Sequence, residues 1–198
     1  MNAPPLTRHE RRRLQTRQQL MRATLELVLE KGYAAVSIQD VTDRADLGRG
    51  TFYIHFKDKD DVLWTAFREL FAQLETEAHA QLERGAAQVE YYGLLNIFQH
   101  AEQNRDLYRV LFGSQGSALL MSRAQDLLAQ TFLSDVRQAP RPPEVDFHLP
   151  HEFEAQLLTG MISRLLHWWL ESPSRYSAKQ MATMTYQALY RKQPPSKA

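Results

Sequence analysis

The sequence predicts an all-α protein, with an N-terminal head of three helices that contains a helix-turn-helix and a C-terminal bundle of helices. Apolar residues recur at spacings of three, four and seven along nearly the whole chain, which is the helical period. The 198 residues include no cysteine, which excludes disulfides and thiolate metal sites and favours a reducing cytoplasm. Because apolar runs stay below the roughly 18 residues of a membrane span, we expect a soluble cytoplasmic protein without a membrane partner.

Charge is distributed unevenly along the chain. Residues 1–60 contain 11 Lys and Arg against 8 Asp and Glu, a net charge of +3, and the remainder has a net charge of −2. Six arginines and one glutamate fall within residues 8–22. A basic front on a neutral or acidic body is typical of a nucleic-acid-binding head, although arginine-rich helix starts are also found simply solvated. We divide the chain into a disordered basic tail (1–12), a helix-turn-helix domain (13–60), a regulatory and dimerisation domain (61–192) and a disordered tail (193–198).

The first predicted helix ends at a glycine. Its apolar face is formed by Leu14, Met21, Leu25 and Val28. Gly32 then provides a stop after a basic last turn.

Two short helices follow, separated by a turn. Ser37 is expected to cap a helix over about 37–45, with Asp40 completing a capping box. Residues 46–48 form a turn that contains glycine, and the next helix directs Phe52 and Phe56 inward at a spacing of four. Short helices joined in this way are the helix-turn-helix pattern.

The third helix carries polar side chains that point away from that core. Neighbouring residues on a helix are about 100° apart, so Arg49, Thr51, Tyr53 and His55 lie largely on other faces than the two phenylalanines. Such side chains contact phosphates and base edges. An amphipathic hairpin with an ordinary polar outer face is the alternative.

The span "SIQDVTDRADLGRGTFYIHFKDKDDVL", residues 37–63, resembles the DNA-binding segment of TetR-family transcriptional repressors, as does the lead-in "EKGYAAVSI". The resemblance covers about the first third of the chain. It implies base contacts from Arg49 and Thr51, phosphate contacts from Tyr53, His55 and Lys59, and further contacts from the second helix. The full set of expected DNA-binding residues is Ser37, Gln39, Arg49, Gly50, Thr51, Tyr53, His55 and Lys59. Two residues depart from the family pattern, namely Asp46 in the turn and Gly48 at the cap of the third helix.

The body is expected to consist of helices with short breaks. Helical runs cover about 61–84, 89–104, 105–113, 117–136, 151–172 and 177–192, with a proline-rich break at 139–144.

The long helix over 151–172 predicts a dimer. Its apolar residues cover more than one face, and the adjacent Trp168 and Trp169 cannot both face one core. A two-fold dimer also suits a palindromic DNA site, and the family resemblance implies an interface built from the last two long helices. A well-buried helix in a monomer is the alternative. The interface candidates are Leu158, Met161, Ile162, Leu165, Trp168, Trp169 and Met184.

Several aromatic residues of the body could line a cavity for a small-molecule effector. From the sequence alone they are more readily explained as core, whereas the resemblance favours a pocket whose ligand alters the separation of the two heads through a hinge near 57–61. The candidates are Tyr91, Tyr92, Phe98, Tyr108, Phe112, Met121 and Phe132.

The sequence contains no convincing motif for a catalytic or metal-binding site. His148 and His151 lie near acidic residues but lack a clearly placed third ligand, and no phosphate-binding glycine loop or nucleophile motif occurs. We therefore expect no enzyme activity, no cofactor and no metal site. The leading hypothesis is a dimeric, ligand-responsive repressor that binds double-stranded DNA. The alternative is an all-helical ligand-binding or protein-interaction module whose head binds DNA poorly.

Overall fold

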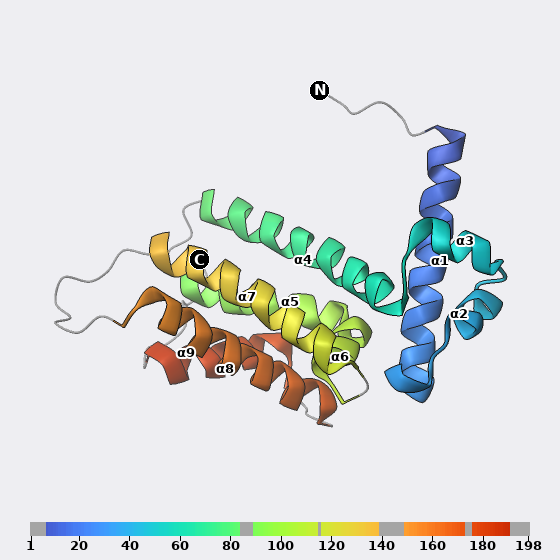
Figure 1. The fold of residues 1–198 in the computed structure, drawn as a ribbon. Coiled ribbons are helices and arrows are strands. Elements are labelled where there is room, and N and C mark those ends of the chain that lie inside the picture. Colours follow the sequence, from blue (N-terminus) through green and yellow to red (C-terminus); the bar gives the residue numbers. More distant parts are fainter. Residues whose placement is uncertain (1–6, 84–88, 115, 139–148, 173–175, 191–198) are drawn as a thin grey trace. The chain divides into compact units, whose positions relative to one another are not determined.

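The computed structural model describes residues 7–83, 89–114, 116–138, 149–172 and 176–190, and every regular element in these ranges is helical. This confirms the all-α prediction. The tail residues 193–198 and His148 lie outside the described ranges. The elements are α1 (Arg8–Lys31), the 3-10 turn η1 (Tyr33–Ala35), α2 (Ile38–Arg44), α3 (Arg49–His55), α4 (Lys59–Glu83), α5 (Val89–Gln103), α6 (Arg105–Phe112), α7 (Ala118–Gln138), α8 (His151–Glu171) and α9 (Ala178–Tyr190), shown in Figure 1.

The chain forms two compact units, residues 1–73 and 74–198, which divide within α4. The boundary predicted from the sequence lies between residues 60 and 61, at the start of the same helix. A continuous helix has no local break, so only packing shows where one unit ends. We call residues 1–73 the head and residues 74–198 the body.

Helix α1 begins earlier than expected. The Thr7 hydroxyl accepts a hydrogen bond from the Glu10 amide, and the Glu10 carboxylate accepts one from the Thr7 amide at 2.7 Å. This capping box satisfies two amides that a helix start otherwise leaves without partners. The prediction of a disordered tail over 1–12 is therefore wrong for residues 8–12, which are helical.

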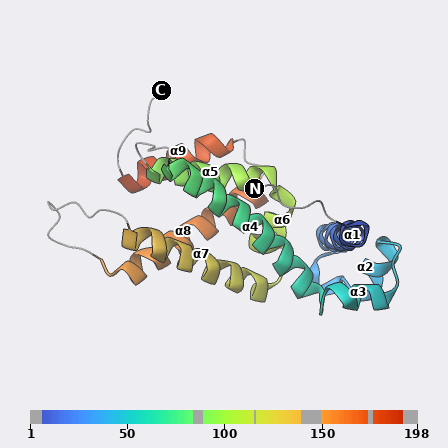
Figure 2. The same cartoon turned by 90° about the horizontal axis from the view of Figure 1, so that it is seen from above.

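The head is built around one buried cluster. Leu20 and Val28 of α1, Val41 of α2, and Phe52 of α3 are almost inaccessible to solvent. Figure 2 looks along α1 and shows α2 and α3 together on one side of it. The apolar face predicted for α1 is partly wrong, because Leu14 is exposed. The buried side of the helix is formed by Leu20, Ala23, Thr24, Leu27 and Val28.

In the body, α5 packs along α9 and α7 packs along α8, while α6 contacts α5, α7 and α8 (Figure 1). Phe98, Phe112, Leu120 and Leu166 are buried at the centre of these contacts. None of the described helices is long and apolar enough to cross a membrane.

The structure separates the two adjacent tryptophans. Trp169 is 1% exposed, its indole N–H donates to the Tyr176 carbonyl at 2.9 Å, and its ring meets the Phe98 ring edge-on. Trp168 is 41% exposed. Ile162 is fully buried as well, so the assignment of Ile162 and Trp169 to a dimer interface is wrong, because both side chains fill the core of the chain itself. Leu158, Met161 and Leu165 are half-buried, and Met184 is exposed.

Candidate nucleic-acid interface

The turn between α2 and α3 has the geometry of a helix-turn-helix. Asp46 adopts a positive φ of 52°, a conformation that aspartate tolerates better than most residues. The Leu47 amide donates to the Thr42 carbonyl at 2.9 Å, which holds the turn closed. Gly48 caps α3 through its backbone, without a side-chain hydrogen bond. The two departures from the family pattern therefore leave the turn intact.

Ser37 starts α2 as predicted. Its hydroxyl accepts from the Asp40 amide at 3.1 Å, and the Asp40 carboxylate accepts from the Ser37 amide at 2.7 Å. Hydrogen bonds from Ser37, together with Lys31 at 3.0 Å, lower the pKa of Asp40 well below its usual range. The capping box that the sequence predicted is confirmed.

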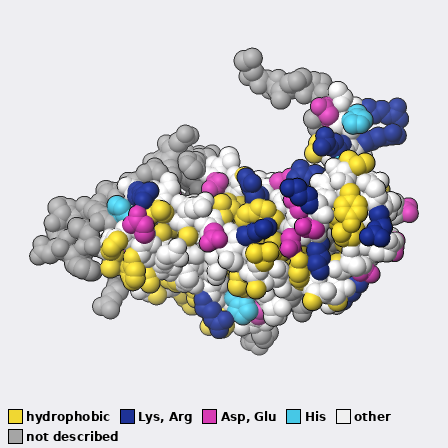
Figure 3. Space-filling model, in the orientation of Figure 1, with side chains coloured by type: hydrophobic (Ala, Val, Ile, Leu, Met, Phe, Trp, Pro, Cys, Tyr) yellow, Lys and Arg dark blue, Asp and Glu magenta, His cyan; other side chains and the backbone are white. Residues whose placement is uncertain are grey.

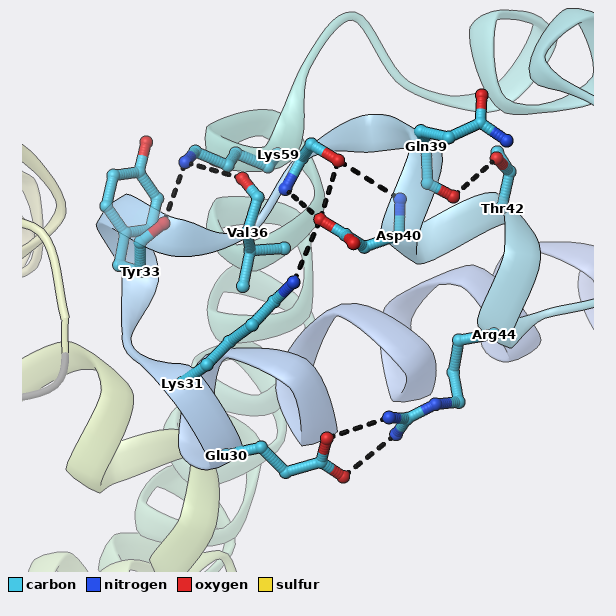
Figure 4. Close-up of polar contacts among 10 residues, drawn as sticks. Glu30, Lys31, Tyr33, Val36, Gln39, Asp40, Thr42, Arg44 and Lys59 are labelled. Carbon is cyan, nitrogen blue, oxygen red and sulfur yellow. Dashed lines mark hydrogen bonds and ion pairs between the residues drawn. The ribbon is translucent and has the colours of Figure 1, made fainter.

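Further polar contacts attach α2 to α1 (Figure 4). The guanidinium of Arg44 binds Glu30 through two hydrogen bonds of 3.0 and 2.7 Å and reaches Glu26 at 3.5 Å. Within α2 itself, the side-chain amide of Gln39 donates to Asp43 at 2.6 Å on the exposed face. The ion pairs of Arg44 fix α2 against α1, and the closed turn at 46–48 joins α3 to α2.

Helix α3 divides into a buried and an open side. Phe52 and Phe56 are buried, as predicted. Arg49, Gly50, Tyr53 and Ile54 are exposed, and Thr51 and His55 are half-buried at the flanks of that open side. We call the open side, formed by Arg49, Gly50, Thr51, Tyr53, Ile54 and His55, the recognition face.

Lys59 has an intramolecular role that the sequence analysis did not foresee. Its ammonium donates to the Tyr33 carbonyl at 2.7 Å and to the Val36 carbonyl at 2.9 Å, and it lies 4.0 Å from the centre of the Tyr33 ring (Figure 4). The Tyr33 hydroxyl donates to Asp60 in the same turn of α4. Lys59 thus ties the start of α4 to the turn after α1, and its expected phosphate contact stays a prediction.

The first turns of α1 add a basic surface beside α3. Arg17 forms an ion pair with Glu69 at 2.6 Å, and its guanidinium lies 5.8 Å from the Phe56 ring. Arg13 lies one turn earlier on the same face of α1. Burial, followed by the positive charges of Arg13 and Arg17, lowers the pKa of His55.

Arginines of this segment are open to solvent. Arg8, Arg11, Arg12 and Arg13 are exposed and form no ion pair with any residue that the structure describes. In Figure 3, Lys and Arg side chains gather with a histidine on the first turns of α1, and in Figure 1 these turns extend beyond α3. The predicted tail over 1–12 included three of the six arginines in residues 8–22, although the spacing of four between Arg13 and Arg17 already indicated one helical face.

The pocket candidates of the body are mostly packed side chains. Tyr91, Phe98, Tyr108 and Phe112 are buried, and the rings of Tyr108 and Phe112 stack. The Tyr108 hydroxyl is hydrogen-bonded to His100 at 2.8 Å, and burial raises the pKa of Tyr108. Tyr92, Met121 and Phe132 are half-buried. This packing agrees with the core interpretation of the four buried residues, and a ligand contact from any of the seven stays a prediction.

The described part of the chain contains no cluster of three or more His, Cys, Asp or Glu residues that could hold a metal ion. His151 begins α8 and is half-buried. Its neighbour Glu152 forms an ion pair with Arg137 at 2.8 Å.

Two family models match the chain. The model described as "Bacterial regulatory proteins, tetR family" matches residues 20–64, and the model described as "Transcriptional regulator C-terminal region" matches residues 91–191. The first match covers the helix-turn-helix and the second covers most of the body.

Individual proteins of known name are similar over most of the chain. The HTH-type transcriptional regulator AcrR of Shigella flexneri is 25% identical over 181 residues, which span 85% of this chain and 84% of AcrR. Among solved structures, NalD, the secondary repressor of the MexAB-OprM multidrug efflux pump in Pseudomonas aeruginosa, has a TM-score of 0.69 at 21% identity and covers 89% of this chain and 95% of its own. The transcriptional regulator FadR from Bacillus subtilis, solved in complex with stearoyl-CoA, has a TM-score of 0.67 at 17% identity, with 87% and 96% of the two chains covered. At these identities the two structures show a shared fold.

Proposed function

The chain belongs to the tetR family of bacterial regulatory proteins, and on that premise we propose that it is a homodimeric, cytoplasmic repressor that releases a palindromic operator when a small molecule binds its body. DNA binding and regulation of transcription follow from the family itself. The dimer, the operator and the effector are the proposal.

The observation that carries the proposal is the two-sided packing of α3. Phe52 and Phe56 anchor the helix in the head, so Arg49 and Tyr53 are left on an open surface. A helix held in this way enters the major groove with its polar side chains toward base edges and phosphates. We assign base contacts to Arg49 and Thr51, and phosphate contacts to Tyr53 and His55.

The basic turns of α1 extend this surface. Exposed guanidinium groups without intramolecular partners are free to neutralise phosphates, and each neutralised phosphate strengthens binding by releasing counterions. Arg13 lies one turn before Arg17, whose guanidinium lies 5.8 Å from the Phe56 ring. We therefore propose that Arg13 continues the row of phosphate contacts beyond the end of α3.

A dimer is supported by the apolar surface of α8 and α9. Leu157 is 53% exposed, Trp168 is 41% exposed and Met184 is 39% exposed. Solvent-exposed apolar side chains on the last two helices are suited to pairing with a second copy, and two-fold symmetry places two recognition helices on half-sites about one helical turn of DNA apart. We retain Leu158, Met161, Leu165, Trp168 and Met184 as interface residues and add Leu157.

An effector is supported by the likeness of the body to regulators of known structure, one of which was solved with stearoyl-CoA. We propose that a small molecule binds within the body and favours a dimer in which the spacing of the two heads no longer matches both half-sites. Such a ligand weakens DNA binding only by its difference in affinity for the two arrangements.

Selection of bound duplexes from a randomised pool tests the proposal. We expect an enriched palindrome whose affinity falls by orders of magnitude between about 50 and 200 mM salt, as multiple phosphate contacts require. Arg49→Ala should relax the base preference at particular positions of the half-site. Failure of a folded, dimeric protein to enrich any sequence would favour the alternative of an interaction module with a head that binds DNA poorly.

A further inference from the structure

The centre of the recognition face is apolar. Helical residues turn by about 100° each, so Gly50 and Ile54 both lie about 200° from the buried Phe52 and point most directly outward. Arg49 and Tyr53 flank this pair on one side, and Thr51 and His55 flank it on the other. The polar residues that the sequence singled out therefore lie on either side of the most outward-pointing positions of α3, and Ile54 occupies one of these positions.

Ile54 is unusually open for its type. Its exposed fraction is 72%, the largest of any large hydrophobic side chain that the structure describes. Single exposed apolar residues are common on protein surfaces and need no explanation by themselves. Ile54 differs because it occupies the middle of a surface that is otherwise built for DNA, and because a β-branched residue is not a preferred choice for a short exposed helix.

Gly50 gives an independent indication of close approach. A methyl group built at Gly50 would meet no atom within 4 Å, and its backbone is helical with a negative φ. The fold therefore does not require glycine here, although a glycine inside a helix destabilises it relative to alanine. The absence of a side chain one turn before Ile54 leaves a gap beside an apolar projection on the same face.

We propose that Gly50 and Ile54 together form an apolar contact site for a thymine methyl group in each operator half-site. The missing side chain at position 50 lets the backbone of α3 approach the floor of the major groove, and Ile54 then packs on the C5-methyl that distinguishes thymine there. The proposal rests on the proposed function, since it assigns base specificity to a residue of the same DNA-binding surface.

The test compares thymine with uracil in the selected operator, because this exchange removes only the methyl group. Each thymine of one half-site is replaced in turn, and dissociation constants are measured for the full-length wild type and for Ile54→Ala. We expect one position at which wild type loses about fourfold in affinity per half-site, the effect of one buried methyl. Ile54→Ala should show no loss at that position, because the partner of the methyl is gone.

Leu119→Ala is the control for Ile54→Ala. It removes an exposed apolar side chain from the body and should retain the full wild-type response to uracil.

Gly50→Ala tests the close approach of the backbone. It should fold at least as stably as wild type and yet bind every duplex more weakly. Its control is Gly93→Ala, which adds a methyl to a helical glycine of α5 that also has open space around it, and this variant should bind DNA as wild type does.

The outcomes separate this inference from the function on which it rests. A palindromic operator in which wild type and Ile54→Ala respond alike to uracil at every thymine would overturn the methyl contact and leave the repressor proposal standing. Unchanged affinity of Gly50→Ala would overturn the close approach. Failure to select any duplex would remove the proposed function, and the methyl contact with it.

Discussion

Replacing Arg13 with glutamine tests whether the first turns of α1 contact DNA in a defined orientation. Arg13 lies on the same face of α1 as Arg17, whose guanidinium lies 5.8 Å from the Phe56 ring, whereas Arg11 lies nearly opposite, about 200° around the helix. Both side chains are exposed, and neither forms an ion pair with a described residue. Glutamine removes the charge and keeps a comparable helix propensity, so the two variants form a matched pair.

The expected magnitude follows from counterion release. One phosphate contact contributes about 0.9 to the slope of log K against log salt concentration, so one Arg13 in each of two protomers contributes about 1.8. Raising the salt from about 50 to 200 mM should therefore reduce wild-type affinity about twelvefold more than it reduces the affinity of Arg13→Gln. Arg11→Gln should keep a slope close to that of wild type.

Fluorescence anisotropy with the selected operator at four or five salt concentrations measures these slopes, and circular dichroism checks that both variants are folded. Equal changes of slope for the two variants would show that the arginines act only as a diffuse positive charge. An unchanged slope for Arg13→Gln would refute the contact itself.

Three further predictions concern stability and assembly. Trp169→Ala should lower the free energy of unfolding of the body by about 3–5 kcal/mol, because it leaves a cavity in the core. Trp168→Ala should leave the thermal stability nearly unchanged and weaken the dimer in analytical ultracentrifugation. Asp46→Ala should lower the free energy of unfolding of the head by about 1 kcal/mol in chemical denaturation, because alanine is strained at positive φ. Asp46→Gly should leave this free energy unchanged or raise it. Equal losses for both variants would contradict the strain argument. Burial lowers the pKa of His55 in the folded head, so folding favours the neutral imidazole and the head loses stability as the pH falls below about 6.5. Chemical denaturation between pH 7 and 5 should show a weaker pH dependence for His55→Gln than for wild type. Identical curves would rule out a contribution from His55.

Local patterns determined the elements and the composition of the recognition face. Ser37 and Asp40 lie within one turn, so their capping box depends on residues adjacent in sequence. Phe52 and Phe56 repeat at the helical period, which identified the inward side of α3 before any packing was known. The Thr7 capping box is equally local, and its T-x-x-E spacing could have shown that α1 starts at Arg8.

Contacts between distant residues decided the rest. Periodicity shows that Trp168 and Trp169 face different directions, but only the packing of Phe98 and the Tyr176 carbonyl shows which of them is core. The ammonium of Lys59 binds carbonyls more than twenty positions earlier in the chain, and the guanidinium of Arg17 in α1 lies 5.8 Å from the ring of Phe56 at the end of α3. The sequence by itself thus determined the helices, the family and the polar side chains of α3, because these depend on near neighbours. The tertiary structure decided which side chains remain open to a partner, because that depends on what the folded chain brings against them.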